Sequence, residues 1–187
     1  CYERKSDCTD DIVHDVLCSK LIDDVIEKNN GISIVSRVGH TFIANRCSDE
    51  NAALAGEVSG HYFFKETNYT DDVLMACIKI LKIFKRSGKP VSELVKKYPK
   101  YIQHLERVTV NEEKKLEFIE ELTEKLKFQG YEVITLDGVK VNFNHGWMLF
   151  RPSNTEPKIS IGYESSDLEE FEKIKKIADE IIKTIPR

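Results

Sequence analysis

The amino-acid sequence predicts an α/β domain followed by a small α+β domain. In the first half, short apolar strands alternate with amphipathic helices, whereas in the second half strands follow one another closely and a helix closes the chain. The clearest break between the two patterns is Ser87-Gly88-Lys89-Pro90. We therefore expect a first domain at 1–88, a linker with a short helix at 89–104, and a second domain at 105–187.

The composition is that of a globular protein with no general attraction for polyanions. Hydrophobic residues make up 41% of the 187 residues, which is enough apolar mass for a core. The formal net charge of −4 argues against nucleic acid or an anionic membrane surface as a partner. We expect neither partner, and an anionic ligand must be held by a local cluster of donors.

The five cysteines form no Cys-x-x-Cys pair, which argues against zinc and dithiol chemistry. Free thiols suit a reducing cytosol, and neither a signal peptide nor a membrane-length apolar run is visible, so we expect a cytoplasmic location. The polar start at 1–11, with Cys rather than Met first, indicates a cut inside a longer protein. A trimmed or disordered terminus is the alternative. The cysteines are Cys1, Cys8, Cys18, Cys47 and Cys77.

The first elements alternate between strand and helix. An apolar run at 12–16 predicts a strand, and Ser19 can cap the helix that follows. This helix should end at Asn29-Asn30-Gly31, with the glycine in the left-handed position. A second strand follows at 32–35. The apolar residues of the helix lie at helical spacing and are Leu21, Ile22, Val25 and Ile26.

The same rhythm continues to the expected break. We predict a helix at 41–47, strands at 53–55 and 62–64, a long helix at 72–86 and a short helix at 91–97. The long helix is strongly apolar, with a broad stripe of the kind that packs on a core. The stripe consists of Val73, Ala76, Cys77, Ile80, Leu81 and Phe84.

The second domain begins with a strand at 107–110 and a charged amphipathic helix that Asn111 caps and Gly130 closes. A hairpin follows, in which Asp137-Gly138 connects two strands at 131–136 and 139–143. The residues of the helix expected to face inward are Leu116, Ile119, Leu122 and Leu126.

The remaining elements are two strands, the loop between them and the last helix. A turn at 144–146 leads to a strand at 147–150, and the strand after the loop covers 159–163. Asp167 caps the final helix. Its expected inner residues are Leu168, Phe171, Ile174, Ile177, Ala178 and Ile181.

The loop Arg151–Pro157 has the composition of a phosphate site. An arginine offers a planar fork that matches two phosphate oxygens, and short hydroxyl and amide side chains add donors. Two prolines restrict the backbone, so less entropy is lost on binding. Glu156 repels phosphate and should point toward a cation. A plain polar turn with an incidental arginine is the alternative. The donors are Arg151, Ser153, Asn154 and Thr155.

The segment Gly56–His61 could read a sugar. Its glycines allow close approach of the backbone to a ligand, and the carboxylate of Glu57 can accept bonds from two neighbouring hydroxyls. Ser59 and His61 can donate to the same ring or to a phosphate. A strand-to-strand turn with solvated side chains remains the alternative. His40 follows a strand and precedes a helix, where phosphate often binds in α/β sheets, although a lone histidine is more often structural.

Taken together, these pieces resemble the α-D-phosphohexomutase family, over a span from about 11 to 185. Gly56–His61 is similar to the sugar-specificity loop of the third domain, and Arg151–Pro157 is similar to the phosphate-binding loop of the fourth. Val38-Gly39-His40 and the hairpin Asp137–Lys140 fit the same alignment.

The resemblance implies a truncated three-layer mixed-sheet domain and a C-terminal domain with a fold like that of the TATA-binding protein. A complete enzyme of this family has four domains around a cleft. A phosphoserine in its first domain interconverts hexose 1-phosphate and hexose 6-phosphate through hexose 1,6-bisphosphate, which also acts as activator. Mg²⁺ is held by an aspartate loop in its second domain. The phosphoserine, the metal ligands and the N-terminal domains would then lie outside this chain.

The resemblance also assigns roles to residues. Glu57 and Ser59 would bind sugar hydroxyls, and His40 and His61 would contact the hexose phosphate substrate. His61 is a candidate proton donor or acceptor. The grip on the phosphate that is not reacting would consist of Arg151, Ser153, Asn154 and Thr155.

The sequence departs from the family pattern in several places. It contains neither the serine loop nor a DGDxDR-like metal loop, and the first strand of the third domain is missing. Leu17 stands where some relatives carry a basic residue. Glu57-Val58-Ser59 and Asn154 favour the phosphomannomutase/phosphoglucomutase type over phosphoglucosamine mutase. We expect the isolated chain to be inactive. A stand-alone phosphosugar-binding module, or a scaffold with degenerate loops, are the alternatives.

Overall fold

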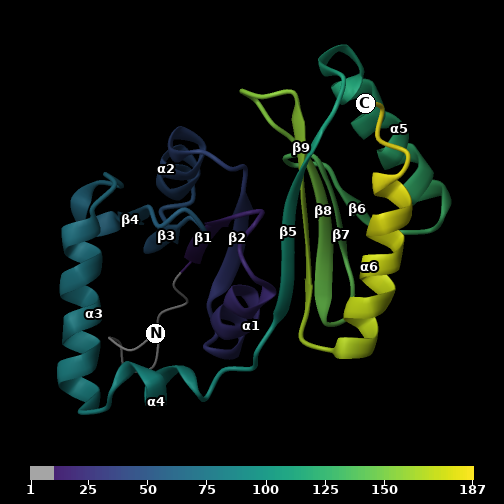
Figure 1. The fold of residues 1–187 in the computed structure, drawn as a ribbon. Helices are drawn as coiled ribbons and strands as arrows, with labels where there is room; N and C mark the ends of the chain where they lie inside the picture. The colour runs from purple at the N-terminus through teal and green to yellow at the C-terminus, as the bar shows by residue number, and fades with distance from the viewer. Residues whose placement is uncertain (1–10) are drawn as a thin grey trace. The chain divides into compact units, whose positions relative to one another are not determined.

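The computed structural model describes residues 11–187, which form two compact units that divide between Pro99 and Lys100 (Figure 1). Cys1 and Cys8 lie outside the described residues. The first strand of the second unit begins at Ile102, within the range 89–104 that we expect to be the linker.

The first unit is built on a mixed sheet of four strands in the order β2-β1-β3-β4. β1 pairs in parallel with β2 and β3, and β4 is antiparallel to β3. α1 packs against β2, α2 against β1 and β3, and α3 against β4. The elements are β1 (Asp11–Asp15), α1 (Lys20–Lys28), β2 (Ile32–Ser36), α2 (His40–Asp49), β3 (Leu54–Gly56), β4 (Tyr62–Phe64), a 3₁₀ turn (Lys65–Thr67), α3 (Val73–Ser87) and α4 (Val91–Val95).

Local sequence signals account for most of these boundaries. Ser19 caps α1, as predicted, by accepting a hydrogen bond from the Leu21 amide. The prediction for the end of α1 is wrong in one respect, because Asn30 and not Gly31 takes the left-handed conformation, with φ of 59°. Asparagine tolerates this conformation better than most residues. The core between α2 and the sheet consists of Val13, Ile43, Cys47, Ala52, Ala55 and Phe63.

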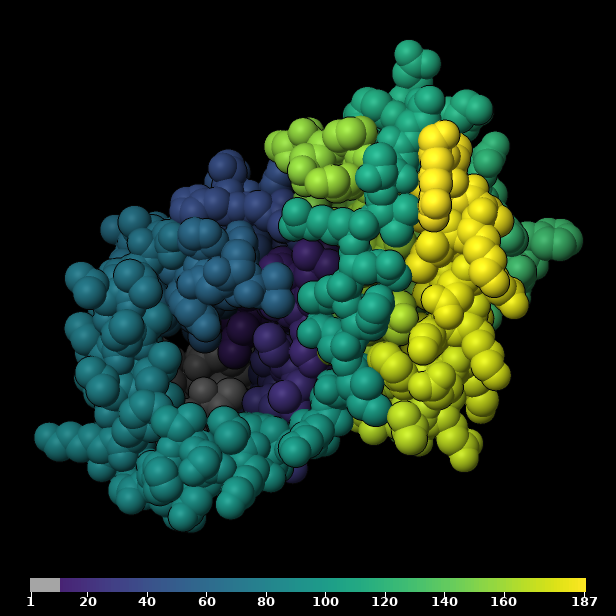
Figure 2. Space-filling view, viewed as in Figure 1, coloured from purple at the N-terminus to yellow at the C-terminus, as the bar shows by residue number. Residues whose placement is uncertain are grey.

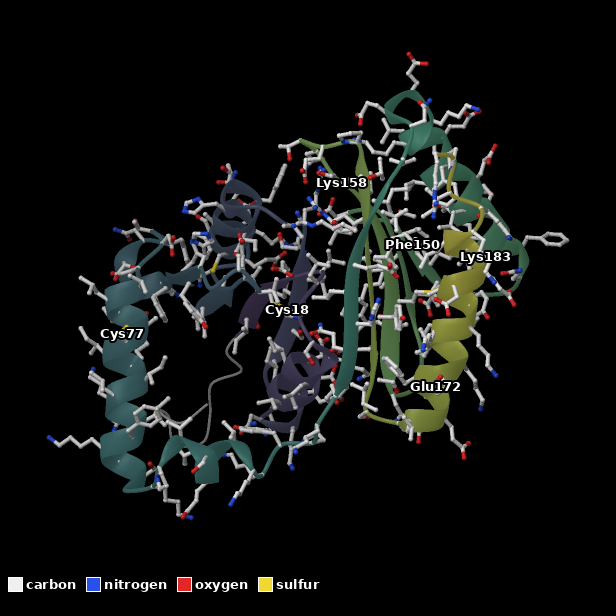
Figure 3. The ribbon with its side chains drawn as sticks, in the orientation of Figure 1. Cys18, Cys77, Phe150, Lys158, Glu172 and Lys183 are labelled. Carbon is white, nitrogen blue, oxygen red and sulfur yellow. The ribbon has the colours of Figure 1, made fainter. Side chains whose placement is uncertain are left out.

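The apolar stripe of α3 is not buried as its pattern predicts. Ala76 is the one buried residue of this helix, whereas Val73 is 61% exposed and Leu81 is 63% exposed. Cys77, labelled in Figure 3, is exposed as well. A hydrophobic pattern fixes which residues share a face of a helix, but not what lies opposite that face.

The second unit is an antiparallel sheet of five strands in the order β5-β9-β8-β7-β6. α5 and α6 both pack on it, and Figure 1 shows them on the same side. The elements are β5 (Ile102–Thr109), a 3₁₀ turn (Glu112–Lys114), α5 (Lys115–Phe128), β6 (Val133–Ile134), β7 (Val139–Asn142), β8 (Gly146–Pro152), β9 (Lys158–Ser165) and α6 (Leu168–Ile182).

The core of the second unit lies between the sheet and these two helices. Phe150, labelled in Figure 3, is fully buried there, and Ile174 of α6 is fully buried as well. The opposite face of α6 is polar and forms part of the outer surface in Figure 2. None of the helices within residues 11–187 has the length and apolarity that crossing a membrane requires.

Two predicted core residues of this unit are wrong. Leu116 and Leu168 are both 62% exposed. Asn111 caps a 3₁₀ turn, as its side chain accepts from the Glu113 amide, and α5 starts only at Lys115. The inner stripe therefore begins with Lys115 and continues through Phe118, Ile119, Leu122 and Leu126.

Truncating Ile174 should destabilise the second unit strongly. We expect Ile174→Ala to lower its free energy of unfolding by about 2–5 kcal/mol, because the change leaves a cavity. Leu168→Ala on the same helix is the matched control and should cost less than about 0.5 kcal/mol. The single tryptophan, Trp147, is buried in this unit, so its fluorescence during urea unfolding measures both variants. Equal losses would contradict the assignment of the core.

Candidate functional site

The segment between β3 and β4 forms a closed tight turn. The Gly60 amide donates to the Glu57 carbonyl at 3.0 Å, and the Glu57 amide donates to the His61 carbonyl at 3.0 Å. Gly60 has φ of +91°, a backbone conformation that residues with a side chain rarely adopt, which explains the glycine at this position. The hydrogen bonds of the turn therefore hold the backbone from which the Glu57 and His61 side chains project.

A buried carboxylate attaches this turn to the sheet. Asp15 ends β1, is 1% exposed, and accepts from the Val58 amide at 2.9 Å and the Leu17 amide at 2.7 Å. These bonds satisfy a charge that would otherwise be costly to bury. We did not assign Asp15 a role from the sequence. The available signal was an acidic residue at the end of an apolar strand.

The Glu57 carboxylate is oriented but has unused capacity. Its Oε2 accepts from the Ser59 hydroxyl at 2.7 Å. Its Oε1 is buried and has no hydrogen-bond partner within residues 11–187. An unpaired buried acceptor is energetically unfavourable, and a donor such as a ligand hydroxyl would relieve it.

His61 is paired with an acid that we did not predict from the sequence. Its Nδ1 lies 2.6 Å from Oδ2 of Asp71, whose Oδ1 accepts from the Tyr62 amide at 3.2 Å. The hydrogen bond and charge of Asp71 raise the pKa of His61. Desolvation acts to raise the pKa of Asp71, but the bonds from His61 and the Tyr62 amide outweigh it, so that pKa is lowered.

His40 lies beside His61, so the structure brings these two predicted residues together. Their ring centroids are 6.0 Å apart, and the His40 ring also meets Phe63 edge-on at 4.9 Å. His40 is the first residue of α2, whose N-cap, Gly39, forms no side-chain cap. The positive end of the helix dipole thus coincides with an exposed imidazole.

Arg151 is part of β8 and not of the loop in which we placed it. It is paired with Ser160 of β9. Its Nε donates to Oδ2 of Asp137 at 2.8 Å, and the two side chains are 13% and 5% exposed. A Cβ at Gly138 would lie 2.8 Å from the Arg151 Cα, so only glycine lets the hairpin approach this closely. The hairpin that we recognised as a turn signal therefore orients the guanidinium.

The loop that follows Arg151 is organised around Ser153. Its hydroxyl accepts from the amides of Thr155 at 3.4 Å and Glu156 at 3.2 Å, and its own amide donates to the Lys158 carbonyl at 2.9 Å. Asn154 and Thr155 are exposed. Their donors therefore remain accessible to an anion.

Glu156 lies against cations, as its repulsion from phosphate led us to expect. Its Oε1 is 2.8 Å from the Lys158 ammonium, and its Oε2 is 3.5 Å from the guanidinium of Arg107. Lys158 is labelled in Figure 3, at the start of β9. The hydrogen bond from Lys158, with its charge, lowers the pKa of Glu156.

The part of the chain that the structure describes contains no group of three or more histidine, cysteine, aspartate or glutamate side chains able to hold a metal ion. We therefore assign no residue within 11–187 to the Mg²⁺ that the family resemblance implies.

Models of protein families match both units of the chain. Residues 2–101 match the phosphoglucomutase/phosphomannomutase alpha/beta/alpha domain III, and residues 105–181 match the C-terminal domain of the same enzymes. The chain belongs to the phosphoglucomutase/phosphomannomutase family. These matches confirm the resemblance drawn from the two loops and the expected order of an α/β domain and an α+β domain.

Curated members of the family are similar over almost the whole chain. A phosphomannomutase from Methanocaldococcus jannaschii is 36% identical over 92% of this chain and 38% of its own length. A phosphomannomutase/phosphoglucomutase from Pseudomonas aeruginosa is 32% identical over 94% of this chain and 38% of its own length. The chain thus spans under two fifths of the length of these relatives.

Solved structures confirm the fold. A phosphoglucomutase/phosphomannomutase family protein from Burkholderia thailandensis matches with a TM-score of 0.81 and 28% identity, covering 93% of this chain and 37% of its own. An N-acetylphosphoglucosamine mutase from Aspergillus fumigatus, solved in complex with glucose 1,6-bisphosphate, has a TM-score of 0.68. It is 14% identical, over 96% of this chain and 39% of its own, and it shows the fold alone.

The His61–Asp71 pair should be visible in a titration. We expect the pKa of His61 to lie above 6.5, and Asp71→Asn to lower it because the acceptor charge is lost. Glu66→Gln is the control, since that exposed acid pairs with Lys79 instead. The chemical shift of the carbon-bound imidazole proton of His61, followed by NMR across the pH range, gives the pKa in the unsubstituted chain and in both variants. An unchanged His61 titration in Asp71→Asn would refute the pairing.

The same pair sets a pH window for the stability of the first unit. The pKa of His61 is raised on folding, so the protonated ring stabilises the folded state. This stabilisation is fully present below the ordinary histidine pKa of 6.5 and is lost as the pH rises through the folded-state pKa. The pKa of Asp71 is lowered on folding, so the ionised carboxylate stabilises the folded state. This stabilisation is present above pH 3.8, the ordinary aspartate pKa, and is lost as the pH falls through the folded-state pKa. The pair is therefore complete at mildly acidic pH.

Proposed function

We propose that this chain supplies the sugar-reading loop and the phosphate grip of an enzyme that interconverts hexose 1-phosphate and hexose 6-phosphate through hexose 1,6-bisphosphate. Its substrates are mannose or glucose phosphates, in keeping with the names of its relatives. The phosphoserine and the Mg²⁺ that would stabilise phosphate charge come from domains that this chain does not contain. Cys47 and Cys77 are free thiols, which suits a cytoplasmic enzyme.

The observation that carries the proposal is the pairing of Arg151 with Asp137. A guanidinium held through its Nε at 2.8 Å keeps a fixed plane, which directs its two terminal amino groups as a preformed fork. The side chains of Ser153, Asn154 and Thr155 follow in the loop after β8 and add donors. Such a grip holds the phosphate that does not react while the other end of the sugar is transformed.

The Glu57 turn supports the reading of the sugar. A carboxylate whose Oε2 is oriented by Ser59 and whose Oε1 has no partner among the described residues can accept bonds from vicinal hydroxyls. The bisphosphate intermediate must be bound in two orientations, and a carboxylate that accepts from either pair of hydroxyls suits both. Catalysis then depends on positioning and on charge stabilisation.

His61 and His40 complete the first unit's contribution. The raised pKa of His61, caused by Asp71, keeps its ring protonated to a higher pH, so it can donate to a hydroxyl or phosphate oxygen. In this role His61 contacts the substrate and holds or gives up a proton. His40, at the start of α2, contributes a second donor beside it.

Arg151→Ala should abolish the phosphate grip. The chain alone should bind mannose 1-phosphate weakly, with a Kd of about 1 mM or above, because part of the site is absent. Losing charge-assisted bonds of about 1.5–3 kcal/mol should weaken binding by roughly tenfold to a hundredfold. Arg46→Ala removes an exposed guanidinium on α2 and is the charge-matched control. NMR titration measures the affinities, and equal binding by both variants rejects the role of Arg151.

The chain alone should not turn over hexose phosphates. Without a phosphoserine there is no group to donate or accept the phosphoryl group, however well the sugar is bound. A coupled assay for glucose 6-phosphate formation from glucose 1-phosphate, with hexose 1,6-bisphosphate and Mg²⁺ present, tests this. Turnover above a blank without protein would contradict the assignment of the transferring group to another domain.

A further inference from the structure

A lysine occupies the first inner position of α5 and contacts the loop segment 153–156. Lys115 is 5% exposed, so its ammonium group is almost removed from water. It donates to the Ser153 carbonyl at 2.7 Å and to the Glu156 carbonyl at 3.1 Å. It also donates to Oε2 of Glu112 at 2.9 Å. An ammonium group has three donors, and these three acceptors use all of them.

The buried ammonium group of Lys115 matches the hydrogen-bonding needs of the loop. Burial of an ammonium group is costly unless it is paired and fully hydrogen-bonded, and the apolar residues that continue the stripe could not satisfy the two carbonyls. Those carbonyls belong to the first and last residues of the loop segment 153–156. Lys115 therefore connects both ends of the segment to one point on α5.

The bonds of Lys115 also decide which groups the loop presents. The Ser153 and Glu156 carbonyl oxygens are acceptors and would repel an anion if they faced it. The Ser153 hydroxyl oxygen accepts from the Glu156 amide at 3.2 Å, and its O–H can still donate. What remains exposed is the pair of side chains of Asn154 and Thr155, which carry donors.

We propose that Lys115 is a positioning residue for anion binding, whose ammonium group holds the Ser153 and Glu156 carbonyls on the α5 side so that a phosphate ester meets donors and not acceptors. This inference rests on the proposed phosphate grip. It extends the site to a residue on a helix, in which the loop is preorganised before the ligand arrives. Lys115 itself does not contact the phosphate.

The test compares Lys115→Met with Lys114→Met in the full chain. Both changes remove one positive charge from neighbouring positions, but Lys114 is exposed and only Lys115 bonds to the loop. Backbone ¹⁵N relaxation reports the order of Asn154, Thr155 and Glu156 without any ligand. We expect their order parameters to fall from about 0.85 to below about 0.6 in Lys115→Met alone.

Titration with mannose 1-phosphate and with inorganic phosphate then measures the consequence for binding. Lys115→Met should bind about tenfold more weakly than Lys114→Met, with loop amide shifts at saturation that differ from those of the unsubstituted chain. An ordered loop with unchanged affinity in Lys115→Met would overturn the proposal, even if the urea midpoint from Trp147 fluorescence fell. That outcome would make Lys115 merely structural.

Two further comparisons keep the inference separate from its premises. If the unsubstituted chain shows no response to either phosphate probe, the proposed phosphate grip fails, whereas loss of loop order in Lys115→Met still supports the positioning role. If Lys115→Met does not fold, Lys115→Arg against Lys114→Arg decides. A longer, planar head cannot reproduce the three bonds of the ammonium group, so equal affinity in that pair overturns the proposal.

Discussion

The burial of charged groups is the constraint on which both candidate loops depend. A buried charge is tolerated only where its hydrogen-bonding capacity is used, and for Asp15, Asp137 and Lys115 the partners lie in the two candidate loops or directly before one of them. Asp15 bonds to the backbone of the turn between β3 and β4, Asp137 to the guanidinium of Arg151, and Lys115 to both ends of the segment 153–156. If either loop moved away from its partner, a buried charge would lose its hydrogen bonds. The free-energy cost of that unsatisfied charge therefore opposes the movement.

The two units use this constraint in different ways. In the first unit the buried anchoring group is the carboxylate of Asp15 at the end of β1, while the partly exposed Asp71 raises the pKa of His61. In the second unit the anchor of the guanidinium is acidic and the anchor of the loop backbone is basic. The surroundings of the candidate anion-binding loop thus pair Arg151 with Asp137 and Lys115 with Glu112, which limits the net local charge.

Most of the fold could be predicted from the sequence, because hydrophobic period and capping residues act locally. The failures have physical causes. The pattern predicts an inward Leu116, but a 3₁₀ turn delays the start of α5 and leaves no signal in that pattern. The apolar stripe on α3 indicates which residues share a face of the helix, but not what lies opposite that face. For the candidate site, the sequence indicates the two loops by their composition but gives no signal for the contacts of Asp15 and Lys115. Their partners lie far along the chain, at Val58 and in the phosphate loop, and no local pattern encodes such pairings.

The close approach at Gly138 has a consequence for inherited variation. Every other amino acid carries a Cβ, which would lie 2.3 Å from the Phe150 carbonyl oxygen and would be strained at φ of +97°. Any missense change in this codon must therefore move the hairpin away from its neighbouring strand and take the Asp137 carboxylate with it. An allele of this kind would displace the carboxylate that orients Arg151 while leaving every polar residue of the loop intact, and a search confined to polar positions would overlook it.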